Sequence, residues 1–248
     1  MIVLKTSSEI ALIREAGQVV ARTLEVLEGM VKPGITTGEL DEAAFEYIVS
    51  QGGEPAFKGY RGYPASICTS VNEQVVHGIP SRQRLKEGDI ISLDVGVKLK
   101  GYYADAARTV SVGKISSLAE RLIRVTQEAL DEGIKHCRNG KRLSDISHVI
   151  QVKAEENGFS VVRKFVGHGI GEKMHEEPQI PNYGPSGRGP ILKEGMIFAL
   201  EPMINAGGYD VKILADNWTV VTADEGLSAH FEHTVAVGKR DPQVLTSL

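Results

Sequence analysis

Cysteine is scarce in this chain, which holds only Cys68 and Cys137 among its 248 residues. Two cysteines without an export signal predict free thiols in a reducing compartment rather than a disulfide framework. The start of the chain, Met1–Thr6, turns polar too soon to serve as a signal peptide, and no apolar run is long enough to cross a bilayer. These absences predict a cytoplasmic protein without a membrane partner.

A large charge of one sign is also missing. Charged residues make up 24% of the chain, and the net charge is -4. Binding to a phosphate backbone needs a basic surface, so we expect no nucleic-acid partner. No G-x-S-x-G or phosphate-loop motif occurs. The hydrophobic residues, 42% of the chain, suffice for one large core or for two fused halves.

What the sequence does contain is an internal repeat. The segment KEGDIISLD at Lys86–Asp94 recurs as KEGMIFALE at Lys193–Glu201. Each copy is typical of a turn followed by a buried strand, and each strand ends in a carboxylate. Acids that meet from two related strands repel each other unless a cation lies between them. The repeat therefore predicts a duplicated fold with a metal site near its pseudo-symmetry axis.

The predicted helices repeat in the same way. Four helix starts are marked by capping residues, at Thr6–Glu9, Thr36–Glu39, Ser117–Glu120 and Ser144. The same spacing separates Gly34 from Gly52 and Gly140 from Gly158, and these glycines flank the second helix of each half. Two helix pairs of matched length, each followed by strands, support the duplication.

Strands are expected after each helix pair. The predicted segments are Ser66–Val71, Asp89–Val97 and Tyr102–Val112 in the first half, and Ser160–Val166, Met196–Ile204, Trp218–Thr222 and Phe231–Val237 in the second. A hairpin turn is predicted at Lys98–Gly101. The segment Gly169–Gly195 is rich in glycine and proline, which predicts a long loop of the kind that often carries function.

Four acids stand on predicted strands: Asp94, Asp105, Glu201 and Glu232. A two-stranded ribbon can place Asp94 and Asp105 on one face, because alternate residues of a strand share a face. His168, between two glycines after a strand, adds an imidazole. Such a donor set suits manganese, iron or cobalt, and bridging carboxylates would hold two ions at the spacing of hydrolytic sites. Each acid alone is equally typical of a surface position, whereas the set favours a metal site.

Two further histidines and an aromatic turn are candidates for substrate contacts. His77, in His-Gly-Ile-Pro, and His175, in His-Glu-Glu-Pro, each follow a predicted strand and can hydrogen-bond a substrate carbonyl or an oxyanion. Turn histidines without a catalytic role are the alternative. An apolar pocket is expected from Tyr60, Tyr63, Cys68 and Trp218, with ordinary core packing as its alternative.

The remaining histidines are expected to play lesser parts. His230 alternates with Glu232 along one strand and is expected to face the site, while His233 points to the opposite face. His136 and His148 fall on predicted helices and are expected to be solvated.

Taken together, these motifs resemble those of the type I methionine aminopeptidases. The resemblance rests on Asp94, Asp105, Gly-His168-Gly, Leu-Glu201-Pro, Phe-Glu232-His-Thr, the segments after His77 and His175, and the Tyr60–Tyr63 turn. It covers nearly the whole chain. It implies the pseudo-two-fold pita-bread α+β fold, a curved antiparallel β-sheet covered by two pairs of α-helices. Residues 1–248 would then form a single catalytic domain, with halves of about 1–113 and 114–248.

The resemblance also implies roles for the site residues. Two divalent ions, with cobalt, manganese, iron and zinc all acceptable, would be bound by Asp94, Asp105, His168, Glu201 and Glu232. A hydroxide that bridges the ions would attack the first peptide carbonyl, and Glu201 would also handle a proton. His77 and His175 would contact the substrate and stabilise the tetrahedral intermediate. Tyr60, Tyr63, Cys68 and Trp218 would form the methionine pocket.

The implied activity is removal of the initiator methionine from nascent proteins and peptides with a small second residue. The partners would be nascent polypeptide N-termini, with a transient association with the ribosome as a further expectation, and the protein would be a monomer. The chain departs from the commoner family pattern at four positions, Gly96, Ala104, Met174 and His230.

Two other functions fit the same fold. Proline dipeptidases and aminopeptidases that cleave before proline usually carry an extra N-terminal domain, for which a helix beginning near Thr6 leaves no room. A catalytically inactive module that binds a partner protein would be expected to have lost metal ligands, and all five are present in this sequence.

Overall fold

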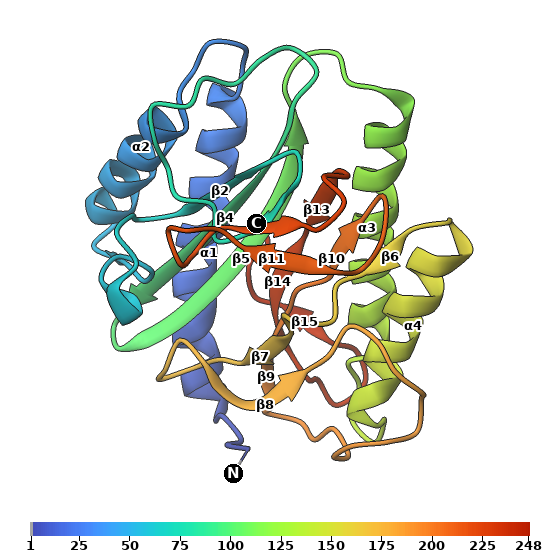
Figure 1. The fold of residues 1–248 in the computed structure, drawn as a ribbon. Helices are drawn as coiled ribbons and strands as arrows, with labels where there is room; N and C mark the ends of the chain where they lie inside the picture. The colour runs from blue at the N-terminus through green and yellow to red at the C-terminus, as the bar shows by residue number, and fades with distance from the viewer. Residues whose placement is uncertain (1) are drawn as a thin grey trace.

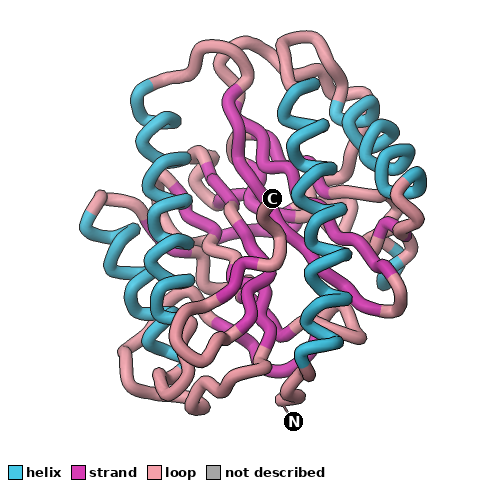
Figure 2. Tube along the Cα trace, turned by 180° about the vertical axis from the view of Figure 1, so that it is seen from behind, coloured by secondary structure: helices cyan, strands magenta, loops and turns pink. Residues whose placement is uncertain are grey.

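Two pairs of helices flank the strands of this protein (Figure 1). The computed structural model describes residues 2–248, and within them it contains the helices α1 (Ser7–Met30), α2 (Thr37–Ser50), α3 (Ser117–His136) and α4 (Leu143–Glu156), with a short 3-10 turn at Tyr60–Gly62. Seen from behind, the long helices lie in front of the strands (Figure 2). No helix of the described part combines the length and the apolar character that crossing a membrane requires.

The helix ends follow the capping residues. Thr6 and Thr36 each accept a hydrogen bond from the backbone of the glutamate three residues on, and that glutamate bonds back, so both predicted capping boxes are confirmed. The prediction for α3 was wrong by one residue. Ser116 is the cap and accepts from the Ala119 N–H, because Ser117 is already helical. Helix α4 begins at Leu143, one residue before the predicted start.

The flanking glycines of the second helices confirm the repeat. Gly34, Gly52, Gly140 and Gly158 all have positive φ angles, of 94°, 75°, 87° and 77°. Side chains rarely adopt this backbone conformation, so glycine is favoured at all four turns. Both halves therefore begin and end their second helix in the same way.

Three sheets form in the described residues. The strands are β1 (Glu54–Pro55), β2 (Cys68–Val71), β3 (Gln74–Val76), β4 (Ile90–Leu99), β5 (Tyr102–Ser111), β6 (Ser160–Val161), β7 (Gly167–Gly169), β8 (Glu176–Ile180), β9 (Ile197–Leu200), β10 (Met203–Asn205), β11 (Val211–Ile213), β12 (Val220–Thr222), β13 (Ser228–His230), β14 (Glu232–Ala236) and β15 (Gln243–Val244). The largest sheet runs β1-β4-β5-β14-β9-β7-β8, with β2 on β4 and β15 on β14, and its pairings are antiparallel.

The two halves meet at the middle of this sheet. Strands β4 and β5 of the first half and β9 and β14 of the second stand in mirrored order about the β5–β14 pair. The pseudo-symmetry axis therefore passes between β5 and β14. Two hydrophobic cores lie beside the sheet. One buries the inner faces of α1 and α2 against β4 and β5 and includes Ile197 and Leu245 of the second half; the other buries those of α3 and α4 against β9 and β14 and includes Ile90 of the first.

Several predicted strand boundaries were wrong. The segment predicted at Ser160–Val166 forms a strand only at its start, and β7 lies beyond its end. The strand predicted at Met196–Ile204 is broken into β9 and β10 at Pro202, which has no N–H for the ladder. The predicted loop Gly169–Gly195 contains β8. The hairpin turn narrows to Lys100 and Gly101, with φ angles of 52° and 87°.

Candidate metal centre and substrate pocket

Three acids lie on one face of the central strands because of the register of the sheet. Ala107 of β5 is the partner of Asp94 on β4 and of Glu232 on β14, so these two acids flank one small side chain. Asp105 lies two residues before Ala107 on β5, and alternation places it on the same face. Acids from both halves are thereby brought together at the pseudo-symmetry axis.

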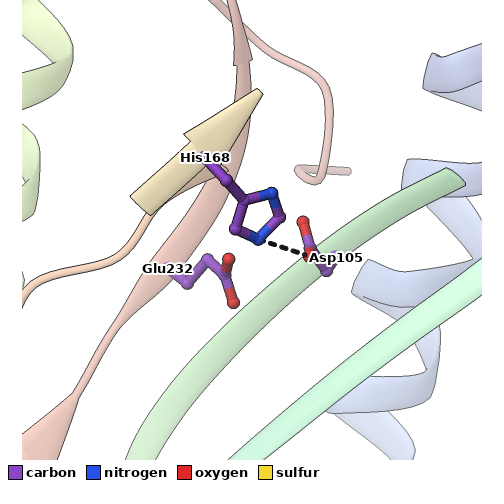
Figure 3. A group of neighbouring side chains, drawn as sticks. All are labelled: Asp105, His168 and Glu232. Carbon is purple, nitrogen blue, oxygen red and sulfur yellow. Dashed lines mark ion pairs between the residues drawn. The ribbon is translucent and has the colours of Figure 1, made fainter. Parts of the chain in front are cut away.

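Glu201 and His168 complete the group from the second half. Glu201 directly follows β9, and His168 is the central residue of β7, the next strand in the sheet. The Nε2 atom of His168 lies 3.6 Å from Asp105 Oδ2 and 3.5 Å from Glu201 Oε1. Ligand atoms of Asp105, His168 and Glu232 all lie within 4.8 Å of one another, and Figure 3 shows the three side chains pointing toward a common centre.

The orientation of His168 is fixed by its neighbours. Its Nδ1 lies 2.9 Å from the carbonyl oxygen of Gly169, so Nδ1 carries the proton and the lone pair of Nε2 faces the acids. The two adjacent glycines are required by close packing. A Cβ at Gly167 would lie 2.5 Å from the carbonyl oxygen of Ala199, and one at Gly169 would lie 2.3 Å from that of Glu177.

The acids are buried together without a permanent cation among the described side chains. Asp94, Asp105 and Glu232 are at most 8% exposed. Among the described residues, Asp105 and Glu201 lie within ion-pair distance of histidines and of no Lys or Arg, and Asp94 and Glu232 have no ion-pair neighbour. Burial raises the pKa of Asp105 to about 7. Burial, and then repulsion from neighbouring acids, raises the pKa of Asp94, Glu201 and Glu232 as well.

These features fit a divalent cation. Asp94 Oδ1 is buried and has no hydrogen-bond partner among the described residues, although a buried polar atom normally has one. Carboxylate oxygens with one neutral imidazole nitrogen form a donor set for a hard or borderline divalent ion. The pKa of His168 is lowered to about 4 by burial, which keeps its ring neutral and able to act as a ligand.

The predicted side chains all line one cavity of about 140 Å³. Its wall contains the five candidate ligands Asp94, Asp105, His168, Glu201 and Glu232, and the six candidate substrate contacts Tyr60, Tyr63, Cys68, His77, His175 and Trp218. Three further residues line the cavity that were not among the candidate substrate contacts: Phe57, Arg61 and Met174, of which Met174 was named only as a departure from the family pattern. Position alone could have suggested Arg61, which lies inside the tyrosine turn, and Met174, which precedes His175, whereas Phe57 has no comparable signal.

One end of the cavity is a packed apolar group. The rings of Tyr63 and Trp218 meet edge to face at 5.0 Å, and Cys68 packs beside them. The Tyr63 hydroxyl lies 3.1 Å from the carbonyl oxygen of Ile67 and 3.0 Å from that of Gly78, so its polar atom is satisfied away from the cavity. Burial, and then the charge of Asp94, raises the pKa of the Cys68 thiol, which agrees with a packing role rather than a nucleophilic one.

The two candidate substrate histidines come from different halves. His77 follows β3, and burial lowers its pKa to about 4. His175 directly precedes β8, so the expectation that it follows a strand was wrong. Its ring stacks on Tyr60 at 5.3 Å and lies 4.2 Å from that of His168, measured between centroids. Loss of water in this packing, and then the nearness of His168, lowers the pKa of His175.

Other histidines differ in their surroundings. His230 on β13 faces the site as expected: its Nε2 lies 4.0 Å from Glu201 Oε2 and is buried without a hydrogen bond from the described residues. His233 bonds Thr246 and does not line the cavity. His136 and His148 are partly buried and contact backbone carbonyl oxygens, so the expectation that they are solvated was wrong.

Comparison with known proteins gives a consistent result. Residues 11–239 match the model of metallopeptidase family M24. A methionine aminopeptidase of Clostridium perfringens is 56% identical over 246 residues, which cover 99% of each chain. The crystal structure of a methionine aminopeptidase from Thermotoga maritima matches with a TM-score of 0.99 and 44% identity, and all of each chain is covered.

A more distant match shares the fold alone. A prolidase from Pyrococcus furiosus superimposes with a TM-score of 0.81 at 21% identity, and the match covers 99% of this chain but 65% of the prolidase. The full-length relatives and the pita-bread architecture point the same way as the buried acids at the junction of the two halves. The chain belongs to metallopeptidase family M24 and, within it, to the methionine aminopeptidases.

Proposed function

We propose that this protein removes the initiator methionine from nascent proteins and peptides whose second residue is small. The observation that carries this proposal is the position of the five candidate ligands, which form one wall of a cavity whose other wall is apolar and aromatic. This arrangement supports hydrolysis beside a bound methionine side chain. The family and the full-length relatives point to the same activity.

We further propose that the site holds two divalent ions. Asp94 and Asp105 would bind one ion, His168 and Glu201 the other, with Asp105 and Glu232 shared between them. Five ligands are more than one tetrahedral site needs, and shared carboxylates are typical of paired ions. When bound, such ions activate a water molecule for attack and polarise the scissile carbonyl. Manganese, iron, cobalt and zinc all accept this donor set.

The side chains of the protein would then position and protonate the substrate. His77 and His175 both line the cavity and are neutral near pH 7, so each can donate one N–H to the carbonyl oxygen on which charge develops. Glu201 lines the cavity beside the other candidate ligands, and its carboxylate would accept a proton and pass it to the leaving amine. Catalytic roles are therefore assigned to His77, His175 and Glu201.

Selection of methionine is assigned to the apolar end of the cavity. Tyr60, Tyr63, Cys68 and Trp218 supply aromatic and sulfur surface, which a flexible thioether chain can fill. A cavity of about 140 Å³ bounds the size of the side chain that enters. Phe57 and Met174 extend the same apolar wall.

The proposal also covers the domain organisation, the oligomeric state and the compartment of the protein. Residues 1–248 would act as a single catalytic domain, because the candidate site draws its side chains from both halves. The protein would work as a monomer in the cytoplasm, where it would meet nascent N-termini in transient association with the ribosome. The free thiols Cys68 and Cys137 are consistent with a reducing compartment.

A peptide assay with the purified protein tests the function. The protein, stripped of metal and then supplied with manganese or cobalt, is expected to release methionine from Met-Ala-Ser and to release none before metal is added. A matched Leu-Ala-Ser peptide should be cleaved far more slowly. Equal cleavage of both would indicate a broad aminopeptidase, and cleavage only before proline would indicate a proline-specific hydrolase. A metal-loaded protein that leaves Met-Ala-Ser intact would contradict the proposal.

A further inference from the structure

Strand β14 changes its partner beside the candidate metal centre. On one edge, Glu232 and His233 pair with β5, whereas Val235 and Ala236 pair with β15. Thr234 lies between these two stretches, where the ladder to β5 has ended and the one to β15 begins. Figure 1 shows β15 close to β14 near the centre of the molecule. A junction of this kind leaves backbone groups that need other hydrogen-bond partners.

The side chain of Thr234 supplies those partners to Asp105. Its Oγ1 accepts a hydrogen bond of 3.0 Å from the Asp105 N–H. Its single proton is shared between the Asp105 carbonyl oxygen at 2.8 Å and the carboxylate Oδ1 at 3.1 Å. One hydroxyl therefore replaces the strand ladder at Asp105 and also touches its carboxylate. Thr234 is fully buried, so no bulk water competes for these bonds.

A second buried hydroxyl, that of Thr246, binds the backbone of Thr234. Thr246 Oγ1 accepts a bond of 3.2 Å from the Thr234 N–H and lies 2.8 Å from His233 Nδ1. The N–H of Leu245 donates to the Thr234 carbonyl oxygen at 2.8 Å. Leu245 and Thr246 are both 0% exposed, so the segment after β15 is buried alongside β14. The contacts form a continuous path from Thr246 through Thr234 to Asp105.

We propose that Thr234 is a positioning residue for the metal ligand Asp105, and that Thr246 holds Thr234 in place. This inference rests on the proposed function, because it takes Asp105 as a ligand shared by two divalent ions. A hydroxyl that fixes one oxygen of a carboxylate leaves the other free to face a cation in a defined direction. His168 Nε2 lies 3.6 Å from that other oxygen, Asp105 Oδ2.

The test measures metal binding rather than activity. Manganese is titrated by calorimetry into metal-stripped full-length protein, and the visible absorption of cobalt-loaded protein reports the coordination geometry. Thr234→Val, which removes only the hydroxyl, is expected to weaken the manganese Kd by about 10–100-fold and to alter the cobalt spectrum. Thr234→Ser keeps the hydroxyl and should restore both. Thr246→Val should weaken the Kd by a smaller factor.

Thr23→Val is the matched control. Thr23 is also 0% exposed, and its hydroxyl donates to the Val19 carbonyl oxygen inside α1, away from the metal centre. The Thr23→Val variant should leave the manganese Kd and the cobalt spectrum unchanged. A wild-type Kd and a wild-type spectrum in Thr234→Val would overturn the inference, and a wild-type Kd in Thr246→Val would overturn the part given to Thr246.

Failure to fold and failure of the metal centre have separate readouts. Circular dichroism shows whether Thr234→Val is folded. If it is not, Thr234→Ala is measured in its place, and a wild-type manganese Kd in that variant would overturn the inference. A wild-type chain that binds no manganese would overturn the proposed metal centre, and this inference with it.

Discussion

The first half of the molecule presents its acids on a long regular hairpin, whereas the second half presents its ligands at the ends of short strands. Asp94 and Asp105 stand on β4 and β5, each ten residues long. Glu201 follows a strand of four residues, and His168 lies within one of three. The two halves therefore place their candidate ligands at the same centre through different local structures. Alternation along a ladder aims Asp94 and Asp105, whereas close packing of the neighbouring glycines against backbone carbonyls positions His168.

The difference shows what a duplicated fold must keep and what it can change. Both halves keep the helix pair and the two strands nearest the axis. The second half breaks its ladder at Pro202 and adds β15 beside β14. The break at Pro202 leaves Glu201 at a strand end, and three residues outside the strands, Met174, His175 and Trp218, line the cavity. We infer that irregularity in one half makes room for the substrate.

The largest effect is expected when a shared acid is removed from either half. Asp105→Ala and Glu232→Ala should each lower kcat about a thousandfold or more, because paired ions supply several kcal/mol of stabilisation to the transition state. The measurements are methionine release from Met-Ala-Ser and the metal content of each variant. Glu120→Ala, on the exposed surface of α3, serves as the control. Near-normal turnover of either variant in metal-replete buffer would break the equivalence of the halves.

The candidate substrate histidines, His77 and His175, come from different halves, so their variants test what each half contributes at the substrate. His77→Ala and His175→Ala should each lower kcat by about 100–1,000-fold, the usual loss when one oxyanion donor is removed. Metal content should not change, because neither residue is among the five proposed ligands. The check is kcat measured beside metal analysis of the same samples. Loss of bound metal in His175→Ala would make it a ligand and show that the second half supplies more ligands than proposed.

Removal of metal should make the free energy of unfolding depend on pH, because the acids from both halves are then buried together without a cation. In metal-free protein the pKa of Asp105 is raised to about 7, and those of Asp94, Glu201 and Glu232 are raised too. The folded state then binds more protons than the unfolded state, whose carboxyl pKa values are near 4, so stability falls as the pH rises from about 4 to about 7.

Metal should reverse this trend, because its ligands are ionised. An ion at a hundred times its Kd adds about 2.7 kcal/mol to the free energy of unfolding. The rise in Tm on adding manganese should therefore be larger at pH 7.5 than at pH 5.5, measured by calorimetry with a chelator as the reference. An equal rise at both pH values would mean that the acids do not titrate as one buried group.

The smallest effect is expected in selectivity, where Tyr63 of the first half meets Trp218 of the second. Trp218→Ala should reduce the preference for methionine over leucine peptides by about tenfold, since contacts in an apolar pocket are worth about 1–3 kcal/mol. Tyr63→Phe keeps the ring and should leave the preference within about threefold of wild type. The ratio of kcat/KM for the two peptides is the measurement, with the manganese Kd as the control. A larger change in Kd than in selectivity would move Trp218 from the pocket to the metal site.

Much of the site followed from local pattern. The repeat predicted carboxylates at the ends of two apolar strands, which made Asp94 and Glu201 visible as a pair. The prediction of a strand end was wrong for Asp94, which lies inside β4, whereas Glu201 directly follows β9. Strand alternation predicted Asp94 and Asp105 on one face of the hairpin without knowledge of the sheet order, and the register of β4 and β5 agrees. The glycines beside His168 signalled a close approach, although only the coordinates identify the carbonyl oxygens of Ala199 and Glu177 as the reason.

Other features were decided by contacts between segments far apart in the chain. Phe57 reaches the cavity because β1 pairs at the edge of β4 and carries the following turn inward. The break of the predicted strand at Pro202 and the strand β8 inside a glycine-rich segment depend on which neighbours complete the ladder. The link from Thr246 to Asp105 joins residues 141 positions apart through Thr234, and no local pattern encodes it.

The sequence by itself determined the duplication, the capping of the first two helices, the set of candidate ligands and the family, because each depends on residue type and short spacing. Only the tertiary structure decided that β5 and β14 lie side by side at the axis, which side chains close the cavity, and which hydroxyls hold Asp105. The physical reason is that spacing along a chain fixes the face on which a side chain lies, whereas its partner is fixed only when distant strands pair and exclude water.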